Sequence, residues 1–197
     1  MIVEFLLEEP SMVNCLEQIL PKILPEGIVL NENCFLRPHN GKSDLVKSIP
    51  RKVKVFSNLT HEAYRIIIVH DQDSNDCKHL KQELAKLCLT NGDCPTLIRI
   101  VCRELESWYL GDMDAIQKVY PSFKADQYRN KAKFRDPDTC NPSDELKKLI
   151  PSFQKSYASK EISKHISIEN NRSASFGHFV SGLKRFLSSD TTHSPLS

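Results

Sequence analysis

The chain has 197 residues, of which 40% are hydrophobic and 26% are charged, and its formal net charge at pH 7 is +2. These values are those of an ordinary globular chain and exclude collagen-like, coiled-coil, disordered and small disulfide-rich classes. No window is apolar over the ~18 residues that a membrane-spanning helix needs. The start turns acidic at Glu4, which does not fit a signal peptide. We therefore expect a cytoplasmic protein with no membrane partner.

The seven cysteines lie at irregular spacings, and no CxxC pair is present. An odd number without paired spacing argues against a disulfide framework and against a zinc ribbon. His79 lies near Cys77, Cys88 and Cys94, but this group also lacks the spacing of zinc ligands. We expect reduced thiols that are mostly buried.

The first hundred residues alternate between short apolar strands and amphipathic helices. The expected strands cover residues 2–7, 28–36, 65–70 and 96–102. The expected helices cover residues 11–24, residues 43–56 and the segment after Asp76, which suits a helix N-cap. Pro50 should kink or split the second helix. The unbroken β-branched run at 65–70 is typical of a strand buried on both faces. This order predicts an α/β fold with a four-stranded, mainly parallel sheet flanked by helices.

The second half of the chain contains no convincing strand. Short helical patterns are separated by prolines, and the last of them, at residues 176–187, is strongly amphipathic and follows a serine-rich cap region. We expect an α/β domain over residues 1–115 and a helical extension over residues 116–187 packed on it. The polar residues 188–197 are expected to form a disordered tail.

Acidic side chains follow three of the expected strands. They are Glu8 and Glu9, Asp71 and Asp73, and Glu104 and Glu106. Carboxyl ends of parallel strands meet at one edge of a sheet, so these side chains are expected to lie together. Asp71 and Asp73 could hold Mg²⁺ or Mn²⁺, and Glu8 or Glu9 could join them as a ligand or act as general acid or base. Aspartates also favour strand ends and helix caps for structural reasons.

Basic side chains form two runs. Residues 37–54 carry six positive charges against one negative, and residues 124–135 carry five against one, with Tyr128 and Phe134 interleaved. Either run could be a solvated face, but both beside a carboxylate cluster favour a phosphate-binding surface. The candidate nucleic-acid contacts are Lys42, Arg51, Lys52, Arg129, Lys131, Lys133 and Arg135.

Two spaced motifs resemble those of Toprim domains. Leu6-Leu-Glu-Glu-Pro-Ser11 precedes Ile66-Ile-Ile-Val-His-Asp-Gln-Asp73, and Arg103-Glu-Leu-Glu-Ser-Trp108 follows them. With the segments at 40–45 and 175–179, they make the chain similar to a Toprim-like bacterial family of unknown function. The resemblance implies a Toprim-like Rossmannoid fold, Glu8 as the acid/base residue, and Asp71 and Asp73 as metal ligands. It also implies a partner ATPase and a role in phage defence.

The chain departs from the Toprim pattern in the segment after Glu8. Glu9 stands where Toprim proteins commonly have glycine, and Met12 stands where nuclease members often have a second glutamate. A two-metal mechanism would need Glu9, Glu104 or Glu106 as the substitute. Trp108 is expected to be a core residue rather than a surface on which bases stack.

Three functions compete at this point. The leading one is a Mg²⁺-dependent nuclease that works with an ATPase. The second is an interaction or regulatory subunit that keeps the fold but has lost catalysis, which the residue at position 12 favours. A haloacid-dehalogenase-type phosphatase also uses Asp-x-Asp, but normally on the first strand.

Two other motifs are discounted. Gly41-Lys-Ser43 lacks the upstream part of a P-loop, which argues against ATP binding there. Adjacent strand positions should point His70 and Asp71 to opposite faces, which argues against a hydrolase dyad.

Overall fold

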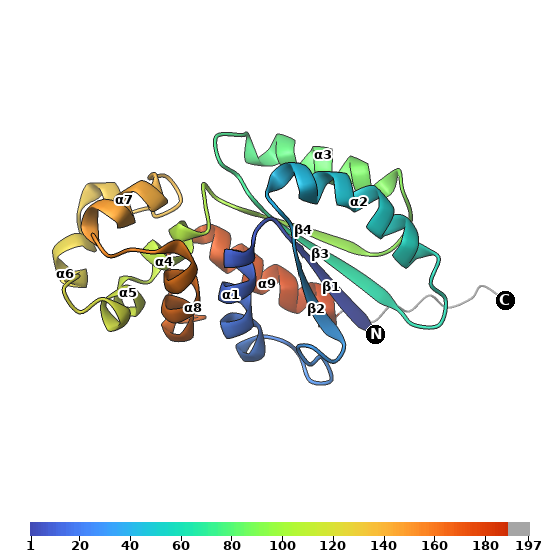
Figure 1. Ribbon diagram of the computed structural model, residues 1–197, viewed down its shortest axis with the longest axis horizontal. Coiled ribbons are helices and arrows are strands. Elements are labelled where there is room, and N and C mark those ends of the chain that lie inside the picture. The colour runs from blue at the N-terminus through green and yellow to red at the C-terminus, as the bar shows by residue number, and fades with distance from the viewer. Residues whose placement is uncertain (189–197) are drawn as a thin grey trace.

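The computed structural model describes residues 1–188 as a parallel sheet with helices on both faces and a helical lobe beyond the carboxyl ends of the strands (Figure 1). The strands are β1 (Ile2–Leu7), β2 (Cys34–Pro38), β3 (Tyr64–Asp71) and β4 (Thr96–Val101). Their order is β2-β1-β3-β4, and every pair is parallel. The predicted α/β fold is confirmed.

The second strand is shorter than the sequence predicts. Leu30 takes part only in an isolated bridge to Cys34, and the residues between them turn, with Asn31 at a φ of 66°. The apolar residues at 28–30 therefore lead into the sheet instead of extending it.

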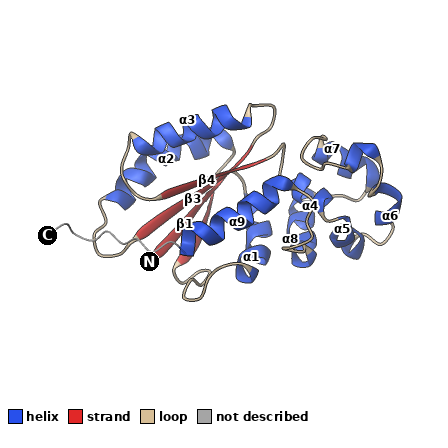
Figure 2. Cartoon of the chain, turned by 180° about the vertical axis from the view of Figure 1, so that it is seen from behind, coloured by secondary structure: helices blue, strands red, loops and turns tan. Residues whose placement is uncertain are grey.

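The crossovers place helices on both faces of the sheet. Helix α1 (Pro10–Ile19), which the 3-10 turn η1 (Leu20–Lys22) follows, and the returning helix α9 (Ala174–Ser188) cover one face. Helices α2 (Lys42–Ser57) and α3 (Cys77–Leu89) cover the other (Figure 2). The chain leaves β1 toward β2 and leaves β3 toward β4, so the direction of winding reverses between β1 and β3. In open α/β sheets, ligand sites form at such a switch point.

Strand β3 supplies apolar side chains to both cores. Ile67 and Val69 join the core under α1 and α9, whereas Ile66 and Ile68 join the core under α2 and α3. Alternate residues of a strand point to opposite faces, so an unbroken apolar run is what this central position requires. The strand brings Asp71 to the sheet edge at its end.

Helix ends and Pro50 test the local predictions. Asp76 Oδ1 accepts a hydrogen bond from the His79 backbone N–H at 2.7 Å, and Ser173 Oγ accepts one from the Phe176 backbone N–H at 3.1 Å, which confirms both caps.

The prediction that Pro50 could split its helix is wrong, because α2 continues through it. The buried stripe of Leu45, Ile49 and Val53 holds both halves against the sheet.

The helical lobe shares one core with the sheet. Its elements are α4 (Glu106–Gly111), α5 (Met113–Val119), α6 (Ala125–Tyr128), the 3-10 helix η2 (Ala132–Phe134), α7 (Pro142–Leu149) and α8 (Lys155–His165). Ile116, Leu146 and Ile162 of the lobe join the cluster that contains Met12 of α1. The packed core therefore crosses the expected boundary at residue 115.

Trp108 is the largest fully buried side chain, as predicted for a core residue. Its ring packs against Phe176 and Phe179 with centroid separations of 5.2 and 5.0 Å, and its indole N–H donates to Ser175 Oγ at 3.0 Å. Trp108 thereby links α9 to α4.

Two further expectations concern the thiols and the chain end. All seven cysteines are free and five are buried, as predicted. The expected tail at 188–197 lies outside the described residues, apart from Ser188 at the end of α9. Among residues 1–188, no helix has the length and apolar character to cross a membrane.

Candidate metal and catalytic site

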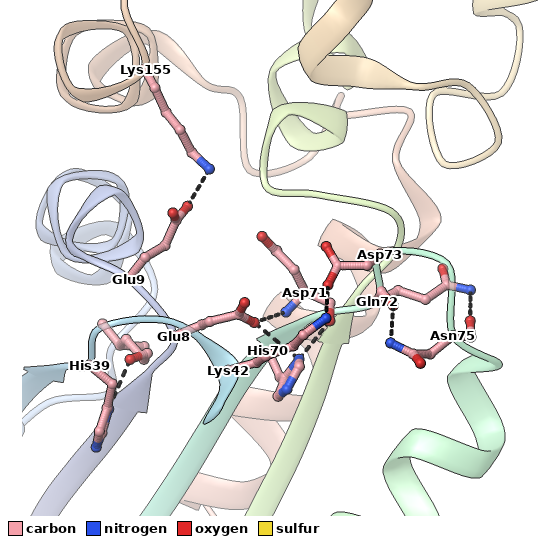
Figure 3. A network of polar contacts seen from close by, with 11 residues as sticks. Glu8, Glu9, His39, Lys42, His70, Asp71, Gln72, Asp73, Asn75 and Lys155 are labelled. Atoms are coloured by element: carbon pink, nitrogen blue, oxygen red, sulfur yellow. Dashed lines mark hydrogen bonds and ion pairs between the residues drawn. The ribbon is translucent and has the colours of Figure 1, made fainter. Parts of the chain in front are cut away.

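Glu8 and Asp71 meet at the switch point between β1 and β3. Leu7 pairs with Val69 in the parallel register, so the next residues of the two strands emerge side by side. Glu8 Oε2 accepts a hydrogen bond from the Asp71 backbone N–H at 3.0 Å (Figure 3). The two strand ends that carry the predicted site are thus directly bonded to each other.

His70 fixes the orientation of the Glu8 carboxylate. Its Nδ1 lies 3.1 Å from Glu8 Oε2 and 2.6 Å from the backbone carbonyl of Asp71 (Figure 3). A carbonyl oxygen can only accept, so Nδ1 carries a proton. Glu8 Oε2 therefore accepts from the Asp71 N–H and lies against His70, while Oε1 has no hydrogen-bond partner within residues 1–188. Burial raises the pKa of Glu8, and His70 and the Asp71 N–H oppose that shift.

The Asp71 carboxyl is buried, and one of its two oxygens has no hydrogen-bond partner among the described residues. The residue is 4% exposed, and its Oδ1 has no hydrogen-bond partner in the part of the chain that the structure describes. Burial raises the pKa of Asp71 well above its usual range, and the neighbouring acids Glu8, Glu106 and Glu9 raise it further. An enclosed acceptor of this kind is costly unless a proton or a cation satisfies it.

Asp73 lies on a constrained turn after β3. Its φ is 52°, its N–H donates to the Arg103 carbonyl at 2.8 Å, and Arg103 itself has a φ of 60°. The Arg103 N–H donates in turn to Gln72 Oε1 at 3.1 Å, so the loops after β3 and β4 hold each other. Left-handed conformations of residues other than glycine are uncommon and cluster at functional sites.

Lys42 reaches the same turn from the start of α2. Gly41, with a φ of 88°, opens this helix, and its N–H donates to the Glu8 carbonyl at 2.9 Å. The next residue, Lys42, places its Nζ 3.2 Å from Asp73 Oδ2 (Figure 3). The pair is exposed, so its contribution to stability is small and a ligand could displace it.

A second acidic group lies beside Asp71 and is bridged by a lysine of the lobe. Lys155, at the start of α8, places Nζ 2.6 Å from Glu9 Oε1 and 3.8 Å from Glu106 Oε1. Glu106 is 0% exposed, and neither of its carboxylate oxygens has a hydrogen-bond partner within residues 1–188. Burial raises the pKa of Glu106, against the opposing effect of Lys155.

Glu104 lies apart from this group. Its Oε2 accepts from the Ser143 backbone N–H at 3.3 Å, and together with Asp73, Arg103 and Lys147 it lines a pocket of ≈ 330 Å³ in front of α7. A second pocket, of ≈ 370 Å³, lies on the other side of the site and is lined by residues that include Lys42, Lys47 and His70. The carboxylates at the switch point are thus flanked by two open pockets that contain basic side chains.

Acids of the lobe neutralise part of the basic run at 124–135. In the lobe, Arg129 pairs with Asp114 and Asp126, and Lys133 Nζ lies 2.6 Å from Glu145 Oε2. The interleaved aromatic residues Tyr128 and Phe134 pack in the lobe. Two of the five basic side chains in the run at 124–135 are therefore neutralised.

On α2, by contrast, Lys47, Arg51 and Lys54 are exposed and make no ion pair with residues 1–188. Lys52 lies over the Phe56 ring. Helix α2 begins at the site, so its basic residues are better placed than the run at 124–135 to contact a nucleic acid bound there.

The donor set fits a hard divalent cation in part. Carboxylate oxygens are the ligands that Mg²⁺ prefers, and Asp71 Oδ1 is a buried acceptor without a partner among the described residues. Within residues 1–188, however, no three His, Cys, Asp or Glu side chains are arranged to hold a metal ion by themselves. Mg²⁺ usually keeps several waters or takes phosphate oxygens, so two carboxylates suffice for an ion that binds together with substrate.

His70, Lys155 and Arg103 belong to this site and were not among the predicted residues. His70 lies within β3, and its ring contacts the Asp71 backbone carbonyl and the carboxylate of Glu8, which alternation along a strand does not predict. Lys155 has no local signal, since only the packing of α8 against α1 brings it to Glu9. Arg103 begins the motif at 103–108, two residues after the end of β4, but the motif did not assign it to the site.

A family model described as a domain of unknown function, DUF4276, matches residues 7–184. The chain belongs to this family. The DUF4276 match begins at the last residue of β1 and ends within α9, so it includes β2, β3, β4, the lobe and each acidic residue described above. No curated protein and no solved structure matches the chain. The expected membership of a family of unknown function is confirmed, and its relation to Toprim domains stays a prediction.

Proposed function

We propose that the protein is a Mg²⁺- or Mn²⁺-dependent nuclease of the Toprim type, which acts in the cytoplasm with a partner ATPase in phage defence. The observation that carries the proposal is the direct bond between the ends of β1 and β3, which places Glu8 beside an Asp71 carboxyl with an unsatisfied buried oxygen. Strained turns and acids with raised pKa values at a switch point are typical of functional sites. The free thiols agree with a reducing compartment.

In this proposal each carboxylate has a separate task. Asp71 and Asp73 would hold the ion, and Glu8 would stay free for proton transfer. The bound ion would supply positive charge at the scissile phosphate and a water of lowered pKa. Glu8 Oε1, which is free while His70 and the Asp71 N–H hold Oε2, accepts the proton of the attacking water. The raised pKa of Glu8 suits proton exchange near neutral pH.

The second acidic group supports a mechanism with a single ion. Met12 is fully buried in the core, so the position of the second Toprim acid carries no charge here. Glu9 is already paired with Lys155 at 2.6 Å. We propose that the fixed ammonium of Lys155 supplies the positive charge that a second ion would bring.

Metal binding can be measured directly by calorimetry with Mn²⁺. The wild-type chain should bind Mn²⁺ weakly, and a phosphodiester analogue should strengthen binding because phosphate oxygens complete the coordination. Asp71→Asn/Asp73→Asn should lose this binding. Asp93→Asn/Glu169→Gln removes the same charge from exposed positions and should behave as wild type. Equal Mn²⁺ binding by all three proteins would exclude the site.

Nucleic-acid binding should depend on α2 more than on the lobe. Lys47→Gln/Arg51→Gln/Lys54→Gln should weaken binding and lower the slope of log affinity against log salt by about 0.7–0.9 for each phosphate that the variant no longer neutralises. Lys131→Gln/Lys133→Gln/Arg135→Gln removes as many charges and should have a smaller effect, since Lys133 already pairs with Glu145. A larger loss of affinity in the lobe variant would assign nucleic-acid binding to residues 124–135.

One observation favours a second candidate, an interaction or regulatory subunit without catalysis. The side chains of residues 1–188 do not complete a metal site by themselves. If the complex with its ATPase cuts neither DNA nor RNA with Mg²⁺ or Mn²⁺, this candidate replaces the nuclease. The phosphatase alternative gains nothing from the structure, because the Asp-x-Asp sequence follows β3 rather than the first strand.

A further inference from the structure

A pocket lies at the outer edge of the sheet, apart from the carboxylates. Strand β4 is an edge strand, and a cavity of ≈ 340 Å³ runs beside it between α3 and α9. Neither Glu8, Asp71 nor Asp73 lines this cavity. Its volume is in the range of small-molecule sites.

The lining is basic and contains no acid. Its charged and polar groups are Arg99 of β4, Lys81 of α3, and Ser175, His178, Ser181 and Arg185 of α9. None of the four basic side chains makes an ion pair within residues 1–188. The acid that contacts this lining, Asp138, is engaged at the start of α9, where it accepts from Ser175 and Ser173. The pocket therefore has an excess of positive charge.

Arg99 is held in place among these basic side chains. Its Nη1 donates to the Ile98 carbonyl at 3.2 Å, and its Nε is buried with no hydrogen-bond partner among the described residues. The guanidinium lies directly on Gly182 of α9, where an added Cβ would come within 1.5 Å of Nη2. Burial and the nearby Arg185 lower the pKa of Arg99, so an anion would relieve an unfavourable charge.

We propose that this edge pocket binds a phosphate group, carried by a nucleotide or by the end of an oligonucleotide. Guanidinium groups bind phosphate oxygens through paired hydrogen bonds, and the Lys81 ammonium and the His178 imidazole add further donors. The pocket uses none of the residues of the proposed nuclease site, so the two proposals stand or fall separately.

Calorimetry in the presence of EDTA tests the proposal on the full chain without the metal site. The probes are inorganic phosphate, adenosine 5′-phosphate, and one oligonucleotide with either a 5′-phosphate or a 5′-hydroxyl. Binding of adenosine 5′-phosphate would identify a nucleotide site. Binding of the oligonucleotide only when it carries the 5′-phosphate would identify a nucleic-acid end.

Three variants should each lower the affinity about tenfold or more, the effect of losing a hydrogen bond to a charged group. Arg99→Gln and Arg185→Gln remove charge. Gly182→Ala keeps every charge but displaces the Arg99 head group, and alanine suits a helix interior better than glycine, so the fold should survive. Lys184→Gln, on the neighbouring exposed position of α9, should bind as wild type.

Two results would overturn the proposal. One is the absence of saturable binding of every probe at millimolar concentration. The other is equal affinity in the wild type and in all four variants. Charged side chains also keep edge strands from pairing between molecules. If Arg99→Gln only makes the chain associate with itself, and the wild type binds no phosphate, Arg99 protects the edge and the proposal is wrong.

Discussion

Asp71→Asn should lose metal-dependent cleavage and, in the absence of metal, melt at a higher temperature than the wild type. Cleavage should fall more than about a hundredfold, since even groups that only support a metal ligand contribute 10- to 100-fold. Stability should rise because the amide removes a charge that is buried beside three other acids. Cleavage assays of the complex with its ATPase and thermal melts in EDTA measure the two effects.

The opposite signs of these effects distinguish a functional residue from a structural one. A substitution that merely damaged the fold would lower cleavage and melting temperature together. Asp73→Asn is the companion variant, because asparagine tolerates the left-handed φ of 52° that alanine would strain. Nucleic-acid affinity should stay close to that of wild type in both. Cleavage by Asp71→Asn at the wild-type rate would refute the assignment of this residue.

Glu106→Gln should stabilise the protein at neutral pH and lose this advantage in acid. The folded-state pKa of Glu106 lies above its ordinary value of 4.5, chiefly because the carboxyl is buried. The folded state holds the proton of such a group more tightly than the unfolded state does. The resulting contribution to stability is complete below the unfolded-state pKa and is lost as pH rises through the folded-state pKa. Glutamine cannot ionise, so the variant escapes the loss. Lys155 keeps Glu9 as its partner.

Melting curves from pH 4 to pH 8 in EDTA would show the effect. Each kcal/mol gained should appear as about 2–4 °C for a chain of this length. The difference between variant and wild type should grow as pH rises. Glu17→Gln, on an exposed position of α1, should show no such trend. A variant that melts lower than the wild type at pH 8 would mean that Lys155 requires the Glu106 charge.

The sheet and the proximity of Glu8 to Asp71 could be predicted because their signals are local. The apolar run before Asp71 requires a central strand, and parallel strands bring Glu8 and Asp71 to one edge. His70 could not be placed in the same way. Alternation along a strand predicts the direction of its side chain, but not that its ring turns back to the end of the neighbouring strand.

The contribution of the lobe depends on contacts between distant segments. Lys155 reaches Glu9 only because α8 packs on α1, and no spacing in the sequence reports that contact. In the run at 124–135, by contrast, the sequence shows basic residues that the fold then partly neutralises. Its charges looked available, but Asp114 and Glu145, which neutralise Arg129 and Lys133, lie outside the run. Charge counts within a window overlook partners of this kind.

The return of α9 to the sheet has a consequence for how the chain is made. The face of β1, β3 and β4 that α9 covers belongs to the core that also contains Phe176, Phe179 and Leu183. During synthesis the strands leave the ribosome long before these residues do, so this face stays uncovered until the last helix emerges. The sheet cannot complete its folding before α9 has been synthesised. A prematurely terminated chain would expose an apolar sheet face and become a substrate for chaperones and proteases.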